Sequence, residues 1–180
     1  VPAMMGLIHG MLAQGRWTEK RASNWLDGAA PFYRCYTCAD GKFIAVGALE
    51  PQIYAILLEK LALPAELVVV QNDTGTWAER TDQFAAIFAT RTRDDWAAHF
   101  DGSDACEAPV LTFSEAPAHP QMAARGALER TGGILQSGIA PRFARSAPPA
   151  PVTPTEIGGD TAEVLAEAGL TADEIAALGL

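Results

Sequence analysis

Residues 32–54, FYRCYTCADGKFIAVGALEPQIY, contain two strand-like runs separated by a turn. Aromatic and β-branched residues in both runs are typical of strands, and the dipeptide Asp40-Gly41 between them is a strong hairpin signal. Pro51 suits the first turn of a helix, where its missing N–H costs no hydrogen bond. This stretch therefore predicts a β-hairpin that leads directly into a helix, with Glu50 at the junction.

Cys35 and Cys38 form a C-x-x-C pair in the first of these strands. Strand positions three apart point to opposite faces of a sheet, so the two thiols would not converge on one ion. The sequence holds no second C-x-x-C, and three cysteines do not make an even disulfide set. We therefore expect no metal site and a reduced, intracellular setting.

Helical patterns lie on both sides of the hairpin. Residues 1–13 carry apolar side chains at spacings of three and four, and Gly15 follows where a helix would end. Residues 21–32 are rich in Asn, Asp, Gly and Pro and predict an irregular connector. Beyond the helix opened by Pro51, we expect helices within 76–91 and at 93–100, the last one capped by Thr92 and Asp95.

The remainder of the chain is expected to alternate short elements with irregular segments: a loop at 106–113, helical turns at 114–126, short strands within 126–143 and a Pro-rich tether at 146–154. Asp160 with Glu163 and Thr171 with Glu174 predict capping boxes that open two short helices. Helices, a hairpin, more helices and late strands indicate an α+β fold with an antiparallel sheet, not a βαβ repeat.

Charge and motifs exclude several function classes. The net charge is −9, from 13 basic against 22 acidic residues, and no basic stripe is present, so nucleic acid is not an expected partner. No apolar run approaches the roughly 20 residues of a membrane span. The sequence also lacks GxGxxG, GxxxxGK[ST], GxSxG and HExxH. It begins at Val1 without an initiator Met, so we expect a preceding segment.

Residues 24–54, NWLDGAAPFYRCYTCADGKFIAVGALEPQIY, resemble the central signature of α-methylacyl-CoA racemases, within the family III CoA-transferase group. The likeness continues at 100–116 (FDGSDACEAPVLTFSEA), 140–146 (APRFARS) and 158–178 (GGDTAEVLAEAGLTADEIAAL), and so covers nearly the whole chain. Several separate motifs in the same order make the resemblance specific.

The resemblance implies proton transfer at the α-carbon of a 2-methylacyl-CoA thioester through an enolate. Such chemistry needs an acid–base group on each face of the α-carbon and donors for the thioester oxygen. In the family, a histidine assisted by a glutamate serves one face and an aspartate the other. The motif places the glutamate at Glu50, whereas the histidine and aspartate would precede Val1. From the residues alone, Glu50 is equally a helix N-cap or first-turn acid.

Three further residues are candidates for substrate binding. Tyr33 resembles a tyrosine that lines the family's acyl site, although a strand aromatic in a core has the same pattern. Met5 belongs to a flexible apolar face, with Met4 and Met11, that could hold an acyl tail or could be core. Leu26, in the connector, is a comparable candidate.

The other polar residues are given structural or minor roles. We interpret Asp40 as a turn residue and Asp27 as a brace for the turn at Gly28. His9, His99 and His119 are assigned to structure or solvent, Asp104, Cys106 and Glu107 to a solvated loop, and Arg16, Arg21 and Arg34 to minor contacts with CoA phosphates.

The resemblance also implies an organisation. The subunit would combine a large Rossmann-like domain, mostly absent here, with a small α+β domain, and two subunits would interlock as a homodimer. Carried over, residues 1–33 form a helix and linker, 34–122 the small domain, 123–154 strands and a Pro-rich linker, and 155–180 C-terminal helices. The active site would form between one subunit's small domain and the other's large domain, so this chain alone would be inactive.

The expected substrate is an acyl-CoA thioester in cytoplasmic fatty acid metabolism, with CoA as part of the substrate and no separate cofactor. Two alternatives stay open. One is a family III CoA transferase of the formyl-CoA or carnitine-CoA type, which uses an aspartate nucleophile in its N-terminal part. The other is a non-catalytic dimerisation or accessory domain.

Overall fold

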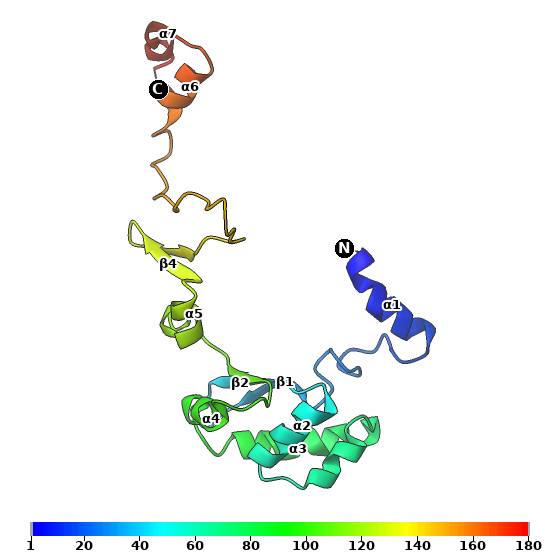
Figure 1. Cartoon of the computed structure of the whole chain (residues 1–180). Helices are drawn as coiled ribbons and strands as arrows, with labels where there is room; N and C mark the ends of the chain where they lie inside the picture. The colour runs from blue at the N-terminus through cyan, green and yellow to red at the C-terminus, as the bar shows by residue number, and fades with distance from the viewer. Residues whose placement is uncertain (1, 180) are drawn as a thin grey trace. The chain divides into compact units, whose positions relative to one another are not determined.

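The computed structural model describes residues 2–179 (Figure 1). They fall into two units, with the boundary between Val110 and Leu111. Each unit combines helices with a small antiparallel sheet, three-stranded (order β1-β2-β3) in the first and two-stranded (β4-β5) in the second. The chain is therefore α+β, as its sequence predicts.

The predicted hairpin is the centre of the first unit. Strand β1 (Tyr33–Thr37) pairs antiparallel with β2 (Phe43–Gly47), with Tyr33 opposite Gly47 and Thr37 opposite Phe43. Gly41 in the turn has a φ of +75°, a conformation that favours glycine. Helix α2 (Pro51–Lys60) follows with Pro51 in its first turn, also as predicted.

A third strand was not expected. Residues 106–113 were predicted to be a loop, but β3 (Glu107–Pro109) pairs antiparallel with β2, with Glu107 opposite Val46 and Pro109 opposite Ile44. Three residues are too few to show a period-two pattern, which is why the strand was missed. The prediction that Glu107 is solvated is also wrong, because β3 holds this residue half-buried.

The helical predictions for the first unit are confirmed. Thr92 caps α4, since its side chain accepts a hydrogen bond from the backbone N–H of Asp95. The remaining elements of this unit are the 3-10 helices η1 (Pro2–Met5), η2 (Ala65–Val70) and η3 (Thr74–Thr76) and the α-helices α1 (Gly6–Ala13), α3 (Trp77–Phe88) and α4 (Arg93–Phe100).

One face of the three-stranded sheet forms the core with the helices. Tyr36 of β1 stacks on Phe88 of α3, with ring centroids 5.0 Å apart, and lies 6.0 Å from Phe84. Its hydroxyl donates a 2.6 Å hydrogen bond to the carbonyl of Pro31, and burial raises the pKa of the phenol. Large buried aromatics of this kind supply much of the packing free energy of a small core.

The second unit contains short elements. Strands β4 (Leu128–Thr131) and β5 (Ile134–Ser137) form the late hairpin, and residues 146–154 are neither helix nor strand, as expected. Thr171 and Glu174 make the predicted capping box of α7. Asp160 occupies the N-cap position of α6, but its side chain makes no capping hydrogen bond and its carboxylate accepts one from Thr155 instead. The helices are η4 (Ala116–Ala118), α5 (Pro120–Ala124), α6 (Thr161–Glu167) and α7 (Ala172–Ala177).

Within residues 2–179, none of the helices combines the length and the apolar character that crossing a bilayer requires.

Candidate functional site

Glu50 lies between the end of β2 and the start of α2. Its backbone is extended (φ −77°, ψ 138°), and its carbonyl accepts the 2.8 Å hydrogen bond from Tyr54 that opens the helix. The side chain is exposed, and among the described residues its carboxylate takes no capping hydrogen bond from the helix N-terminus. Glu50 therefore occupies the N-cap position while its carboxylate is left available to another partner.

The junction before Glu50 is held by Gln71, a residue that sequence reasoning missed. Gln71 is only 3% exposed, and its Nε2 donates to the carbonyl oxygens of Ala48 (3.2 Å) and Leu49 (3.0 Å). The backbone carbonyl of Gln71 accepts a 2.9 Å hydrogen bond from Nε1 of Trp77. The only sequence signal is that Gln71 follows the apolar run at 68–70, and it shares that place with a second amide, Asn72.

Tyr33 lies on the sheet face opposite the core. Its side chain is 37% exposed, so it is not the core aromatic of the alternative interpretation. It lines a cavity of about 430 Å³ together with Cys35, Gly47 and Cys106. A Cβ built on Gly47 would lie 3.9 Å from the Tyr33 ring and 3.5 Å from the Cys106 sulfur. Because glycine has no side chain, the space between these two groups stays open.

Leu26 and Met5 lie on other elements. Met5 is the last residue of η1 and is 43% exposed, and Leu26 is half-buried in the connector. The cavity beside Tyr33 is lined by neither of them, nor by Glu50. The described part of the chain thus places Tyr33 and Glu50 near the ends of the hairpin, with the two proposed acyl contacts elsewhere.

Asp27 braces the connector, as predicted. Its carboxylate accepts hydrogen bonds from the backbone N–H groups of Ser23, Asn24 and Ala29 and from the side-chain amide of Asn24. Burial alone would raise the pKa of Asp27, but these hydrogen bonds outweigh it and lower the pKa below its ordinary value. Asn24 in turn bonds the backbone of Thr18, so the loop carrying Leu26 is cross-linked.

Glu107 is the second residue whose environment the sequence did not reveal. Val46 of β2 pairs with Arg34 of β1 on one side and with Glu107 of β3 on the other. Glu107 therefore shares the sheet face on which Val46 is buried. Burial, with a smaller contribution from Asp101, raises the pKa of Glu107 to about 7. Its Oε2 is buried and has no hydrogen-bond partner within the described residues. Glu107 is therefore a carboxyl group that changes charge near neutral pH.

The two thiols of the C-x-x-C pair point to opposite faces, as predicted. Cys35 is exposed and Cys38 is buried, where burial, the Asp40 carboxylate and a smaller opposing effect of Arg93 leave the pKa of the thiol raised. In residues 2–179, no three His, Cys, Asp or Glu side chains are grouped so that they could hold a metal ion.

The chain is similar to known proteins over most of its length. The family model for CoA-transferase family III matches residues 1–161. The chain is 44% identical to alpha-methylacyl-CoA racemase of Mus musculus over 163 residues, covering 89% of the chain and 43% of that protein. It is 39% identical to alpha-methylacyl-CoA racemase of Homo sapiens over 164 residues, covering 88% of the chain and 42% of that protein.

Among solved structures, a CAIB/BAIF family protein from Brucella suis matches with a TM-score of 0.61 at 18% identity, over 92% of this chain and 44% of that one. At this identity the match supports the fold alone. The chain spans less than half the length of the two racemases that it matches. Because the family model covers most of the sequence, the chain belongs to CoA-transferase family III.

Proposed function

We propose that this chain is part of an α-methylacyl-CoA racemase and delivers Glu50 to an active site that another segment completes. The identity to the mouse and human racemases supports this class of reaction. The observation that carries the role of Glu50 is its side chain: it is exposed just after β2, the central strand of the sheet, and makes no capping hydrogen bond to the helix that follows.

The proposed reaction consists of two proton transfers, one from and one to the α-carbon, with no net change in the number of protons on the substrate. A histidine on one face of the thioester takes the α-proton, the resulting enolate oxygen is held by hydrogen-bond donors, and an aspartic acid on the other face returns a proton to the α-carbon. The Glu50 carboxylate accepts the second N–H of the imidazole, which fixes its tautomer and raises its basicity. The reverse direction exchanges the roles of histidine and aspartate.

The remaining site residues serve binding in this proposal. Tyr33 contacts the thioester or its surroundings, because its phenol is exposed beside a cavity at the end of the hairpin. Leu26 and the partly exposed Met5 contact the acyl chain. CoA is part of the substrate, and the protein works as an interlocked homodimer with a large domain in the cytoplasm, in fatty acid metabolism.

The test is α-proton exchange of a 2-methylacyl-CoA in deuterated water. We expect no exchange from these 180 residues alone. In the longer protein, Glu50→Gln should lower the exchange rate by about 10²- to 10⁴-fold, the range for loss of acid–base assistance. Glu59→Gln is the matched control, because Glu59 is also an exposed carboxylate of the same region. Exchange by the isolated chain, or a full rate in Glu50→Gln, would refute the proposal.

A CoA transferase is the second candidate, favoured by the name of the family whose model matches. Such an enzyme would move CoA between two carboxylic acids without exchanging the α-proton. Incubating the longer protein with an acyl-CoA and a second, isotopically labelled carboxylate distinguishes the two: labelled acyl-CoA indicates transfer, and deuterium at the α-carbon indicates racemisation.

A further inference from the structure

Gln71 connects the segment after η2 to the strand end that precedes Glu50. The Gln71 side chain is almost fully buried, and one amide nitrogen reaches two successive carbonyl groups, those of Ala48 and Leu49. The residues are 22 and 23 positions apart in sequence, so this contact is tertiary. The backbone of Gln71 is itself fixed, because its main-chain carbonyl accepts the Trp77 indole N–H.

The two carbonyls belong to the short link between sheet and helix. The last paired residue of β2 is Gly47, and α2 begins at Pro51. Ala48 has no exposed surface, so its carbonyl needs a protein donor in place of water. Gln71 supplies that donor.

Glu50 is thereby held from both directions along the chain. On its C-terminal side, the carbonyl of Glu50 accepts the hydrogen bond from Tyr54 that opens α2, and Pro51 has a restricted φ. On its N-terminal side, the Gln71 amide fixes the two preceding peptide groups. The backbone of Glu50 is therefore set by its neighbours while its carboxylate is exposed.

We propose that Gln71 is a positioning residue for Glu50. It does not touch the substrate; it sets the backbone from which the Glu50 carboxylate is aimed. The kinetic consequence rests on the proposed role of Glu50. Misplacing a catalytic group by about 1 Å can cost about 10²-fold in rate, so loss of the Gln71 donor should act on the chemical step.

The first test needs no catalytic activity. Gln71→Met keeps the length of the side chain but removes both N–H donors. In the 180-residue chain we expect the NMR order parameter of the Glu50 amide to fall from about 0.85, typical of rigid backbone, to below about 0.6. The control is Tyr36→Phe, which removes another buried hydrogen bond, to the Pro31 carbonyl, and should leave Glu50 rigid.

An unchanged Glu50 amide in Gln71→Met would overturn the proposal. If Gln71→Met does not fold, the unsubstituted chain still decides: a Glu50 order parameter below about 0.6 would show that Gln71 does not fix the junction.

The second test uses the longer protein and α-proton exchange. We expect Gln71→Met to lower kcat by about 10- to 100-fold while KM changes little, and Tyr36→Phe to leave both near their normal values. A rise in KM with kcat unchanged would overturn the positioning role. The Glu50→Gln measurement is separate: a full rate there refutes the function of Glu50, while the NMR result continues to report on Gln71.

Discussion

Lys60 and His99 exchange hydrogen bonds across the C-terminal ends of two helices. The Nζ of Lys60 donates to the carbonyl of His99 (3.2 Å), and the Nε2 of His99 donates to the carbonyl of Lys60 (2.8 Å). The last carbonyls of a helix have no partner within that helix. Each side chain therefore caps the helix of the other, which joins α2, the helix opened by Glu50, to α4.

We expect this exchange to be measurable as a coupling free energy. Lys60→Met and His99→Leu should each lower the free energy of unfolding by about 1 kcal/mol, the usual net value of one hydrogen bond. The double variant should lose less than the sum of the two, because each change removes part of the same arrangement. Urea denaturation measures all three, and Lys20→Met, at an exposed position, is the control. Strict additivity would show that the two bonds are independent.

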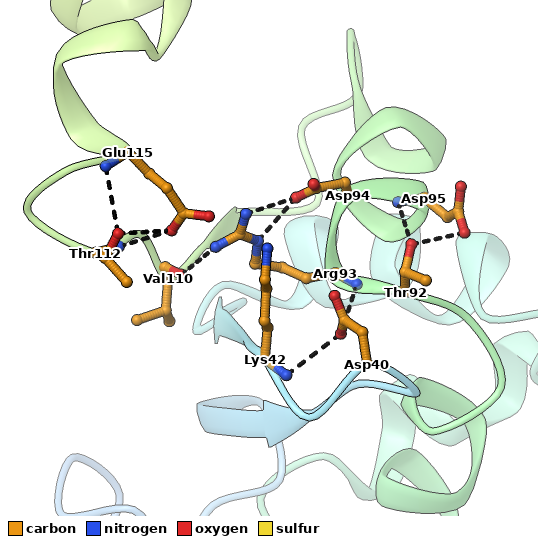
Figure 2. Close-up of polar contacts among 9 residues, drawn as sticks. All are labelled: Asp40, Lys42, Thr92, Arg93, Asp94, Asp95, Val110, Thr112 and Glu115. Atoms are coloured by element: carbon orange, nitrogen blue, oxygen red, sulfur yellow. Dashed lines mark hydrogen bonds and ion pairs between the residues drawn. The ribbon is translucent and has the colours of Figure 1, made fainter.

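Arg93 ties the start of α4 to the end of β3 (Figure 2). The residue is only 4% exposed; its Nη1 donates to the carbonyl of Val110 (2.9 Å), and its Nε donates to the carboxylate of Asp94 (2.8 Å). The backbone N–H of Arg93 donates to Asp40, which also accepts from the backbone of Lys42 in the hairpin turn. The turn role predicted for Asp40 is thus confirmed, and it extends to α4.

Arg93→Lys should not be a conservative change. Lysine carries its three N–H donors on one nitrogen, so it lacks the planar guanidinium that directs Nη1 to Val110 and Nε to Asp94 from two separate positions. We expect the free energy of unfolding to fall by about 1–3 kcal/mol, the range for hydrogen bonds to charged groups. Thermal or urea denaturation measures it, with Arg21→Lys at an exposed position as control. Equal stability of the two variants would contradict the assigned role of the buried guanidinium.

Glu107 should make stability depend on pH. Its pKa in the folded protein is about 7, above the ordinary value of 4.5, so the folded state binds the proton more tightly than the unfolded state does. The resulting stabilisation is complete below about pH 4.5 and is lost as pH rises through about 7. Glu107→Gln, which is neutral throughout, should lose less stability between pH 5 and pH 8.

At pH 8 we expect Glu107→Gln to exceed the unsubstituted protein in unfolding free energy by about 1–3 kcal/mol. Urea titrations at the two pH values measure the difference, and Glu19→Gln at an exposed position controls for loss of one negative charge. An equal pH response of Glu107→Gln and the unsubstituted protein would show that this carboxyl group is solvated.

The sequence predicted the elements whose signals are local. Asp40-Gly41 specified a turn and Pro51 a helix start, because each acts through its own backbone. Strand β3 was missed because three residues carry no periodic pattern. The spacing of Asp160 and Glu163 predicted a capping box, but the Asp160 carboxylate accepts a hydrogen bond from the Thr155 hydroxyl in place of a helix N–H group. Spacing alone does not reveal such an alternative donor.

The candidate site was predictable in part for the same reason. Glu50 follows from a motif that is contiguous in sequence, and its N-cap position from Pro51. Gln71 acts on Ala48 and Leu49 through a contact that exists only after folding. The environment of Glu107 likewise depends on its burial within β3, a strand that the sequence did not predict, and on Asp101.

The three cysteines should differ in reactivity toward a thiol reagent at pH 8. Cys35 and Cys106 are exposed, whereas Cys38 is buried and its pKa is raised, chiefly by burial and also by Asp40. Only the thiolate reacts, and it must be accessible. We expect two thiols to react quickly with a disulfide reagent and the third only when the protein is unfolded. Mass spectrometry of the peptides identifies them. Fast labelling of Cys38 in the folded chain would contradict the hairpin register, since Tyr36 and Cys38 would then not both face the core.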